Sequence, residues 1–459
     1  MRNSVKNKLD SLFFTRLFVQ QAAQSSSYRR AECEIQLAIP SALKNACRME
    51  INMKFIDGGV TAPKGFMAAS AAAGIKYQGR DDMALVVSEN MAVTAGTFTT
   101  NVVKAAPVKW DMAIMDKKKS VKAVVLNSGI ANACTGVVGD ENNEYMAQVI
   151  ADELNVNKDD ILTASTGVIG VQLSKEPLAK GAKLLAANLG NDYEHGVKAA
   201  RAIMTTDTVM KQCAVTFTVD GKSVTIGGMS KGSGMIHPNM ATMLGVVTTD
   251  LNISVEMLTK AVKADVKDSF NMISVDRDTS TNDSLMVMAN GQAGNKIIDS
   301  EGPEFEAFKA ALAMVTKALA KKMASDGEGA TKLIESRVIG AANDEEARVL
   351  AKSVITSNLV KSAVFGSDAN WGRIVCALGY SGVEFNPDKV DLSIEANGET
   401  LKIFENGMAT DYLEEDAARI FAAQEVITIA DMKQGNGKAV AWGCDLTYDY
   451  VKINGDYRS

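Results

Sequence analysis

Histidine is scarce in this chain: His195 and His237 are the only two among 459 residues. A metal site built from three histidines is therefore excluded, and a Ser–His–Asp triad would have to use one of these two. His195 lies in a polar stretch, residues 192–196, which indicates a surface position. We expect any nucleophile in this protein to find its base elsewhere.

Other features that are missing narrow the class further. The six cysteines form no CxxC pair, which fits reduced thiols in a cytosol-like compartment better than disulfides or a zinc site. With a net charge of -6 and no long Lys/Arg stripe, nucleic acid is not an expected partner. No apolar run approaches the roughly 20 residues of a membrane helix, and both GxxxxGK[ST] and a GxGxxG after a strand are absent. We expect a globular protein with no metal, cofactor, membrane or nucleic-acid partner.

The first 50 residues differ from the rest. Residues 1–30 hold six Lys/Arg and a single acid, Asp10, which is typical of a mitochondrial presequence. Acidic residues after position 30 interrupt this pattern, and they favour a disordered or non-native extension with translation starting near Met49 or Met53. We therefore predict that residues 1–50 are an extension and that the protein is cytoplasmic. A mitochondrial protein is the alternative if the presequence is real.

The remaining chain alternates between apolar strand patterns and helical periodicity. Strands are predicted at residues 83–87, 92–99, 122–127, 161–164, 214–219, 223–226, 272–275, 284–289, 426–430 and 438–443. Helices are predicted at residues 141–154, 177–188, 255–266, 303–324 and 344–362. Hairpin turns at Asp220-Gly221 and Asn397-Gly398 make a purely parallel sheet improbable. The class is mixed α and β.

The stretch of residues 231–245 is the centre of the functional hypothesis. A glycine-broken loop carries Lys231, and the small-residue step Ala241-Thr242 opens an apolar run. A threonine hydroxyl needs an adjacent base, and at a chain terminus its own α-amine, with a pKa of about 7.7–8.0, can serve. That solution requires cleavage of the peptide bond before Thr242. The small side chain of Ala241 would hinder attack on its own carbonyl very little. From these residues alone, a capped buried segment is the simpler interpretation.

Residues 228–244 closely resemble the signature of the glutamate N-acetyltransferase (ornithine acetyltransferase) family. The resemblance covers nearly everything from residue 52 to 459 and excludes residues 1–50. Its further motifs, in chain order, are residues 57–66, 165–170, 204–208, 326–332, 368–373 and the tail at Asn454. Several motifs in the right order are far more specific than any one of them.

The resemblance implies a layered αββα-type fold with an N-terminal threonine nucleophile and a smaller second α/β domain. It also implies self-cleavage between Ala241 and Thr242. Residues 51–241 would form an alpha chain and residues 242–459 a beta chain that begins at the nucleophile. The two chains would stay together, as a heterotetramer of two each.

The activity implied by the resemblance is acetyl transfer in arginine biosynthesis. Thr242 would take the acetyl group from N-acetylornithine and pass it to glutamate, which is ping-pong covalent catalysis. Acetyl-CoA is a second donor in bifunctional members, and we favour a bifunctional enzyme. Two alternatives stay open: an N-terminal-nucleophile amidase or aminopeptidase that passes the acyl group to water, and a non-catalytic binding protein with an uncleaved chain.

The resemblance also assigns roles to individual residues. Thr166 and Gly167 match the oxyanion-hole pair, whose donors stabilise a tetrahedral intermediate. The charge of Lys231 suits a substrate carboxylate, and Glu328 could pair with an amine of ornithine. The full set of substrate-binding residues is Thr206, Thr208, Lys231, Thr242, Glu328, Asn454 and Ser459. His237 receives no direct role, and none is assigned to Arg277, Asp278 or Arg373.

Overall fold

A computed structural model describes residues 53–117, 120–237 and 243–456 of the chain. The predicted extension of residues 1–50, the predicted cleavage site at Ala241 and Thr242, and Ser459 lie outside these residues.

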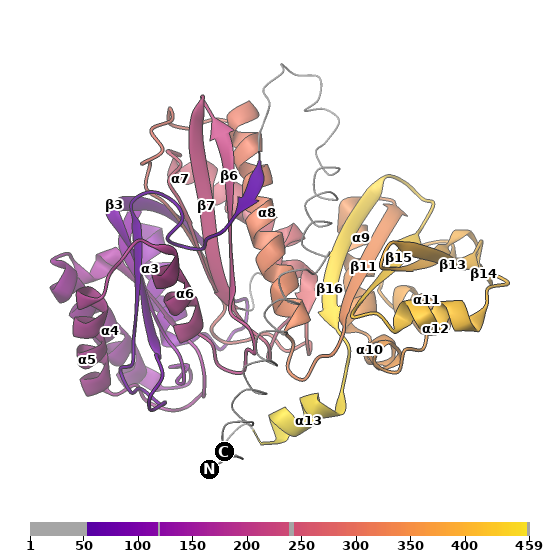
Figure 1. Cartoon of the computed structure of the whole chain (residues 1–459), viewed down its shortest axis with the longest axis horizontal. Helices are drawn as coiled ribbons and strands as arrows, with labels where there is room; N and C mark the ends of the chain where they lie inside the picture. The colour runs from indigo at the N-terminus through magenta and orange to yellow at the C-terminus, as the bar shows by residue number, and fades with distance from the viewer. Residues whose placement is uncertain (1–52, 118–119, 238–242, 457–459) are drawn as a thin grey trace, which may run out of the picture.

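Strands and helices alternate through most of the described chain (Figure 1). The strands are β1 (Lys54–Ile56), β2 (Phe66–Ala71), β3 (Met83–Phe98), β4 (Ser120–Asn127), β5 (Ile161–Ser165), β6 (Lys211–Val219), β7 (Lys222–Lys231), β8 (Leu244–Thr249), β9 (Ile273–Ser274), β10 (Ser284–Ala289), β11 (Leu333–Ala341), β12 (Asp391–Ala396), β13 (Glu399–Glu405), β14 (Met408–Ala409), β15 (Glu425–Asp431) and β16 (Gly437–Cys444). The helices are α3 (Ala106–Lys117), α4 (Gly136–Leu154), α5 (Lys175–Ala187), α6 (Tyr193–Ala202), α7 (Val255–Asp265), α8 (Pro303–Ser325), α9 (Asp344–Thr356), α10 (Asn358–Phe365), α11 (Trp371–Gly379), α12 (Glu414–Phe421) and α13 (Tyr448–Gly455).

The first sheet runs in the order β1-β6-β7-β8-β10-β3-β4-β5, and β2 pairs with β3 beside this path. The β6–β7 hairpin turns at Asp220-Gly221, where both residues have positive φ (49° and 70°) as a type I′ turn requires. Strand β8 pairs antiparallel with β7 and parallel with β10. The part of the chain after residue 242 thus contributes two inner strands to this sheet.

The sheet folds over itself into two facing layers. In β10, Met286 and Met288 enter a core shared with Val124 and Leu126 of β4, while neighbouring residues of both strands face away. The outer face of β6, β7, β8 and β10 packs against α7 and α8, and the outer face of β2, β3 and β4 packs against α4 and α5. The order of layers is α, β, β, α, as predicted for this region.

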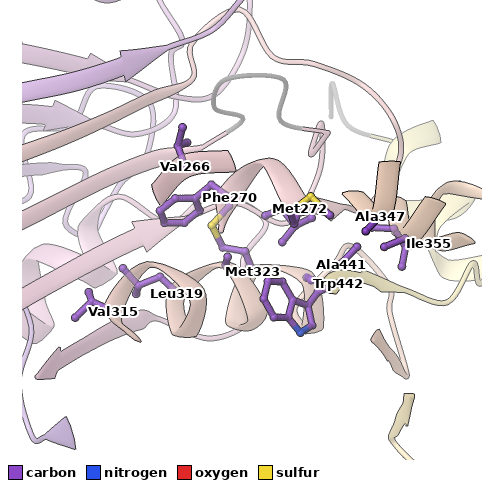
Figure 2. Packing of buried hydrophobic residues seen from close by; sticks show 14 of the residues in the cluster. Val266, Phe270, Met272, Val315, Leu319, Met323, Ala347, Ile355, Ala441 and Trp442 are labelled. Carbon is purple, nitrogen blue, oxygen red and sulfur yellow. The ribbon is translucent and has the colours of Figure 1, made fainter. Parts of the chain in front are cut away.

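A second, smaller unit follows along the chain. Its sheet runs β14-β13-β12-β15-β11-β16-β9, and α9 packs on β11 and β16. Helix α8 joins the two units: Figure 2 shows Met323 of this helix between Phe270 and Trp442, which is in β16. Because one hydrophobic cluster runs through both units, they share a continuous core.

The mixed α/β class is confirmed, and three details of the predicted elements are wrong. The helix predicted at residues 344–362 is two helices, because the Ser357 side chain accepts a hydrogen bond from Val360 N and begins α10. The strands predicted at 83–87 and 92–99 are one strand, β3, with a register shift between Val87 and Ala92. Helices α3, α6, α11, α12 and α13 were not predicted.

Two absences concern the described residues only. Over residues 53–117, 120–237 and 243–456, no helix is both long and apolar enough to cross a membrane. Nor does that part of the chain contain a group of three or more His, Cys, Asp or Glu residues placed to hold a metal ion.

Candidate active site

One end of the two-layered sheet gathers the predicted site residues. Strands β5 and β7 end there, at Ser165 and Lys231, and β8 and β10 begin there. The Asn282 amide, just before β10, ties the two layers together by donating to the carbonyls of Ala131 (2.6 Å) and Ser165 (2.8 Å). Residues far apart in the sequence therefore meet at this edge.

Thr166 and Gly167 follow β5 directly. The Thr166 amide donates to the carbonyl of Asn127 (3.0 Å), so its backbone N–H is already used. Its hydroxyl oxygen accepts a hydrogen bond from Lys231 Nζ (3.3 Å). A hydroxyl that accepts from an ammonium keeps its own proton for a second partner. The side chain of Thr166, rather than its amide, is the donor available to a ligand.

Gly167 adopts a backbone that only glycine accommodates. Its φ is +130°, and a Cβ atom there would lie 2.2 Å from the carbonyl carbon of Gly129. The loop at Gly167 and the loop at Gly129 therefore lie so close together that no side chain fits at position 167. This contact fixes the backbone at the end of β5.

We expect Gly167→Ala to destabilise the protein much more than Gly170→Ala. Gly170 also has positive φ (+82°), but a Cβ there meets nothing within 4 Å. The matched variant should lose roughly 1 kcal/mol from backbone strain, and Gly167→Ala roughly 3 kcal/mol or more, because a clash adds to the strain. Urea unfolding midpoints would measure the difference. Equal midpoints for the two variants would contradict the packing described.

Lys231 is a buried lysine at the end of β7. Its side chain is 9% exposed, and Nζ donates to the hydroxyls of Thr205 (2.9 Å) and Thr166 (3.3 Å). The nearest carboxylate oxygen, Asp207 Oδ2, is 3.8 Å away. Burial lowers the pKa of Lys231, and the charge of Asp207 opposes this shift. Because its hydrogen-bond partners within the described residues are neutral hydroxyls and Asp207 stays at 3.8 Å, this ammonium can take up a further anion.

A second buried lysine stands behind the first. Lys211, fully buried, donates to Asp207 Oδ1 (2.7 Å) and Asp326 Oδ2 (2.5 Å). Burial alone would raise the pKa of Asp207, but the charges of Lys231 and Lys211 and hydrogen bonds from Lys211 and the Gly232 amide lower it well below its usual range. Asp207 is therefore ionised at neutral pH.

Glu328 lies in the loop after α8 and is 6% exposed. Its amide donates to the carbonyl of Ser233 (2.9 Å), and a Cβ on Gly234 would lie 2.3 Å from the Glu328 carboxyl carbon. The glycine-broken loop after β7 thus leaves room for this carboxylate. Asn454 of α13 donates to Glu328 Oε2 from its side-chain amide (2.8 Å), which brings the C-terminal helix to the site.

The two predicted threonines are already bonded within the protein. The hydroxyl of Thr206 lies 2.7 Å from the hydroxyl of Ser233, and the Thr208 hydroxyl donates to Asp326. The structure therefore connects Thr208 to the turn after α8 rather than leaving its hydroxyl free. Thr206 stays close to the loop that carries Lys231.

His237 closes the described part of this loop. Its Nδ1 lies 3.1 Å from the hydroxyl of Ser274, and burial together with the charges of Lys352 and Arg277 lowers its pKa to about 4. His237 is neutral at pH 7, and nothing in its contacts assigns it a catalytic role. Arg373 donates to the carbonyl of Leu359 (2.8 Å), a structural contact in the second unit.

The sequence reasoning did not single out several residues of this site: Thr205, Asp207, Lys211, Ser233 and Asp326. Asp207 and Asp326 lie within the quoted motifs, where their threonine and glycine neighbours are also typical of ordinary turns. Lys211 carried no signal, because a lysine at a strand start is ordinarily exposed. Its burial depends on Asp207, which is close in the sequence, and on Asp326, which is 115 residues away.

The layered fold places the buried ammonium of Lys231 against two threonine hydroxyls at one edge of the sheet, an arrangement suited to an enzyme whose substrate carries a carboxylate or carbonyl group. Comparisons with known proteins specify it further. The ArgJ family model matches residues 67–459. A relative from Caldanaerobacter subterraneus subsp. tengcongensis, the arginine biosynthesis bifunctional protein ArgJ, is 50% identical over 407 residues, covering 89% of this chain and 100% of the relative.

Two solved structures are also similar. Arginine biosynthesis bifunctional protein ArgJ from Bacillus halodurans shares 47% identity over 46% of this chain and 97% of its own, with a TM-score of 0.44. Ornithine acetyltransferase from Mycobacterium tuberculosis, complexed with ornithine, shares 39% identity over 41% of this chain and 100% of its own, with a TM-score of 0.39. The chain belongs to the ArgJ family. The predicted family and the prediction of an acyltransferase of arginine biosynthesis are confirmed.

Proposed function

We propose that this enzyme transfers an acetyl group from N-acetylornithine to glutamate through an acetyl-threonine at Thr242. The observation that carries the proposal is the pair of oppositely charged side chains at one edge of the sheet. Lys231, held by the Thr166 and Thr205 hydroxyls, suits an α-carboxylate, and Glu328 suits the side-chain ammonium of ornithine.

The backbone around Thr242 supports its role as the nucleophile. Met243 and Leu244 follow it directly; the Met243 carbonyl accepts a hydrogen bond from Ser284 N (2.7 Å), and Leu244 pairs with Lys231. The first described residues after position 242 therefore lie beside Lys231, whose ammonium contacts Thr166. Cleavage between Ala241 and Thr242 frees the α-amine that removes the hydroxyl proton.

Thr166 and Gly167 form the oxyanion hole in this proposal. When the Thr242 hydroxyl attacks the acetyl carbonyl, negative charge develops on the carbonyl oxygen. The Thr166 hydroxyl and the Gly167 amide donate to that oxygen, while Lys231 beside them adds positive charge. The glutamate α-amine then attacks the acetyl-enzyme, so the acetyl group passes to an amine and Thr242 is regenerated.

Glu328→Gln is expected to raise the KM for N-acetylornithine by roughly tenfold to a hundredfold, because a hydrogen bond to a charged group contributes about 1.5–3 kcal/mol. Steady-state rates of ornithine release would measure it. Glu399→Gln is the matched control, since Glu399 pairs with Arg419 in the second unit. An unchanged KM in the Glu328 variant would show that this carboxylate does not bind the donor.

Residues 51–241 and 242–459 form the two chains of the mature enzyme in this proposal. We expect them to elute together under native conditions and to separate only in denaturant. The physical reason is that β8 and β10 lie between β7 and β3, so the later chain is inserted into the sheet of the earlier one. Size-exclusion chromatography followed by denaturing electrophoresis tests this, and separation in native buffer would contradict it. The same elution volume tests the heterotetramer.

Acetyl transfer must be distinguished from the alternative, hydrolysis by an amidase or aminopeptidase. Incubation with N-acetylornithine and labelled glutamate should give labelled N-acetylglutamate, whereas free acetate as the only product would support a hydrolase. Acetyl-CoA as the sole donor tests the bifunctional activity. Cytoplasmic localisation stays a prediction, which N-terminal sequencing of the intact protein would test.

A further inference from the structure

Two lysines with buried side chains lie side by side near the end of the β6–β7 ladder. Lys211 begins β6 opposite Ser230, the neighbour of Lys231 in β7. The side chain of Lys211 is 0% exposed and that of Lys231 is 9% exposed. Burying two like charges together is unfavourable unless carboxylates compensate them.

Asp207 lies between the two lysines. It also accepts hydrogen bonds from the backbone of two residues next to the Lys231 side chain or main chain. Its Oδ1 accepts from Lys211 Nζ (2.7 Å) and from the Gly232 amide (2.7 Å). Its Oδ2 accepts from the Thr205 amide (3.1 Å) and lies 3.8 Å from Lys231 Nζ. One carboxylate thus holds the backbone of Gly232, which follows Lys231, and of Thr205, to which Lys231 donates. It also places a negative charge close to the Lys231 ammonium.

Lys211 and Asp326 extend the same network of buried charges away from Lys231. The Asp326 carboxylate accepts hydrogen bonds from Lys211 Nζ (2.5 Å) and from the amide and hydroxyl of Thr208. The Asp326 side chain is 5% exposed. Since Lys211 is shared between Asp207 and Asp326, it holds the Asp207 carboxylate in place without leaving its own charge unpaired.

We propose that Asp207 is the positioning residue that aims Lys231 and keeps it protonated for binding the substrate carboxylate. This inference rests on the proposed function of Lys231. Four charged groups act on Lys231: Asp207 from the loop before β6, Lys211 from β6, Glu328 from the loop after α8, and Asp283 from the loop before β10. In the part of the chain that the structure describes, Asp207 is the carboxylate within 4 Å of the Lys231 ammonium.

The test is the pH dependence of kcat/KM in Asp207→Asn. The variant keeps the size of the side chain but removes the negative charge, so Lys231 loses its proton at lower pH than in the wild type. We expect the KM for N-acetylornithine and glutamate to rise at least tenfold, kcat to change less than KM, and the alkaline limb of kcat/KM to move to lower pH. Lys211→Met removes a repelling charge and should move that limb to higher pH.

Asp391→Asn is the matched control. Asp391 is also a largely buried carboxylate that accepts from two lysines and a backbone amide, but it lies in the second sheet. This variant should keep the wild-type KM and pH limb. Asp207→Glu retains the charge and should keep the wild-type limb while raising KM, which tests the positioning role even if Asp207→Asn does not fold.

The results separate this inference from the proposed function. If the wild type transfers acetyl groups but Asp207→Asn and Asp207→Glu leave KM and the pH limb unchanged, the positioning role is overturned. If Asp391→Asn produces the same changes as Asp207→Asn, the effect is a general consequence of losing a buried charge, and the inference is overturned as well. A wild-type enzyme without transfer activity contradicts the proposed function itself.

Discussion

Thr242→Ala is expected to remain a single uncleaved chain and to lose acetyl transfer by roughly 10³-fold or more. Alanine has no hydroxyl, so it can neither attack the preceding carbonyl nor carry an acetyl group. Denaturing mass spectrometry measures the chain length, and production of N-acetylglutamate measures the activity. Circular dichroism should show an unchanged fold, because the strands on either side of residue 242 keep their pairing.

Thr218→Ala is the control for this variant. Thr218 is an exposed threonine on β6, near the hairpin turn at the other end of the β6–β7 ladder. Its substitution should leave both cleavage and transfer intact. Normal turnover in Thr242→Ala would identify another residue as the nucleophile, and an intact chain in active wild-type enzyme would exclude self-cleavage.

Thr166→Val is expected to lower kcat by about 10²–10³-fold with little change in KM, because one oxyanion donor contributes mainly in the transition state. Valine retains the shape of threonine and lacks the hydroxyl proton. In the proposed oxyanion hole the side chain is the donor, since the Thr166 amide is bonded to Asn127. Single-turnover rates of acetyl-enzyme formation would measure the chemical step directly.

The matched variant is Thr205→Val. Its hydroxyl accepts from the same lysine as that of Thr166, Lys231 Nζ. Loss of this contact should weaken substrate binding, so KM is expected to change more than kcat. Equal effects of the two variants on kcat would mean that Thr166 acts only by holding Lys231.

The sequence predicted the fold well where the pattern is local. The Asp220-Gly221 turn is set by neighbouring residues, and it is found as expected. The break at Ser357 was missed because helical periodicity continues across it, and only the side-chain cap reveals a new helix. The folding of one sheet into two layers depends on contacts between β4 and β10, more than 150 residues apart, which no local pattern encodes.

The site was predicted through motif resemblance, and the structure adds the connections between the motifs. Lys231 and Thr166 were separate predictions, and the structure places them 3.3 Å apart. The contact between Asn454 and Glu328 is also found, although α13 itself was not expected. Asp207 and Lys211 were missed because burial of a charged pair depends on tertiary packing rather than on sequence spacing.

The insertion of β8 between β7 and β10 has a kinetic consequence once the chain is cut before Thr242. The intact precursor refolds by a first-order process, whereas the mature enzyme must first bring two separate polypeptides together. Recovery from denaturation should therefore depend on protein concentration for the mature enzyme and not for the Thr242→Ala precursor. Self-cleavage would thus convert a protein that refolds at a rate independent of concentration into one whose recovery requires two chains to associate.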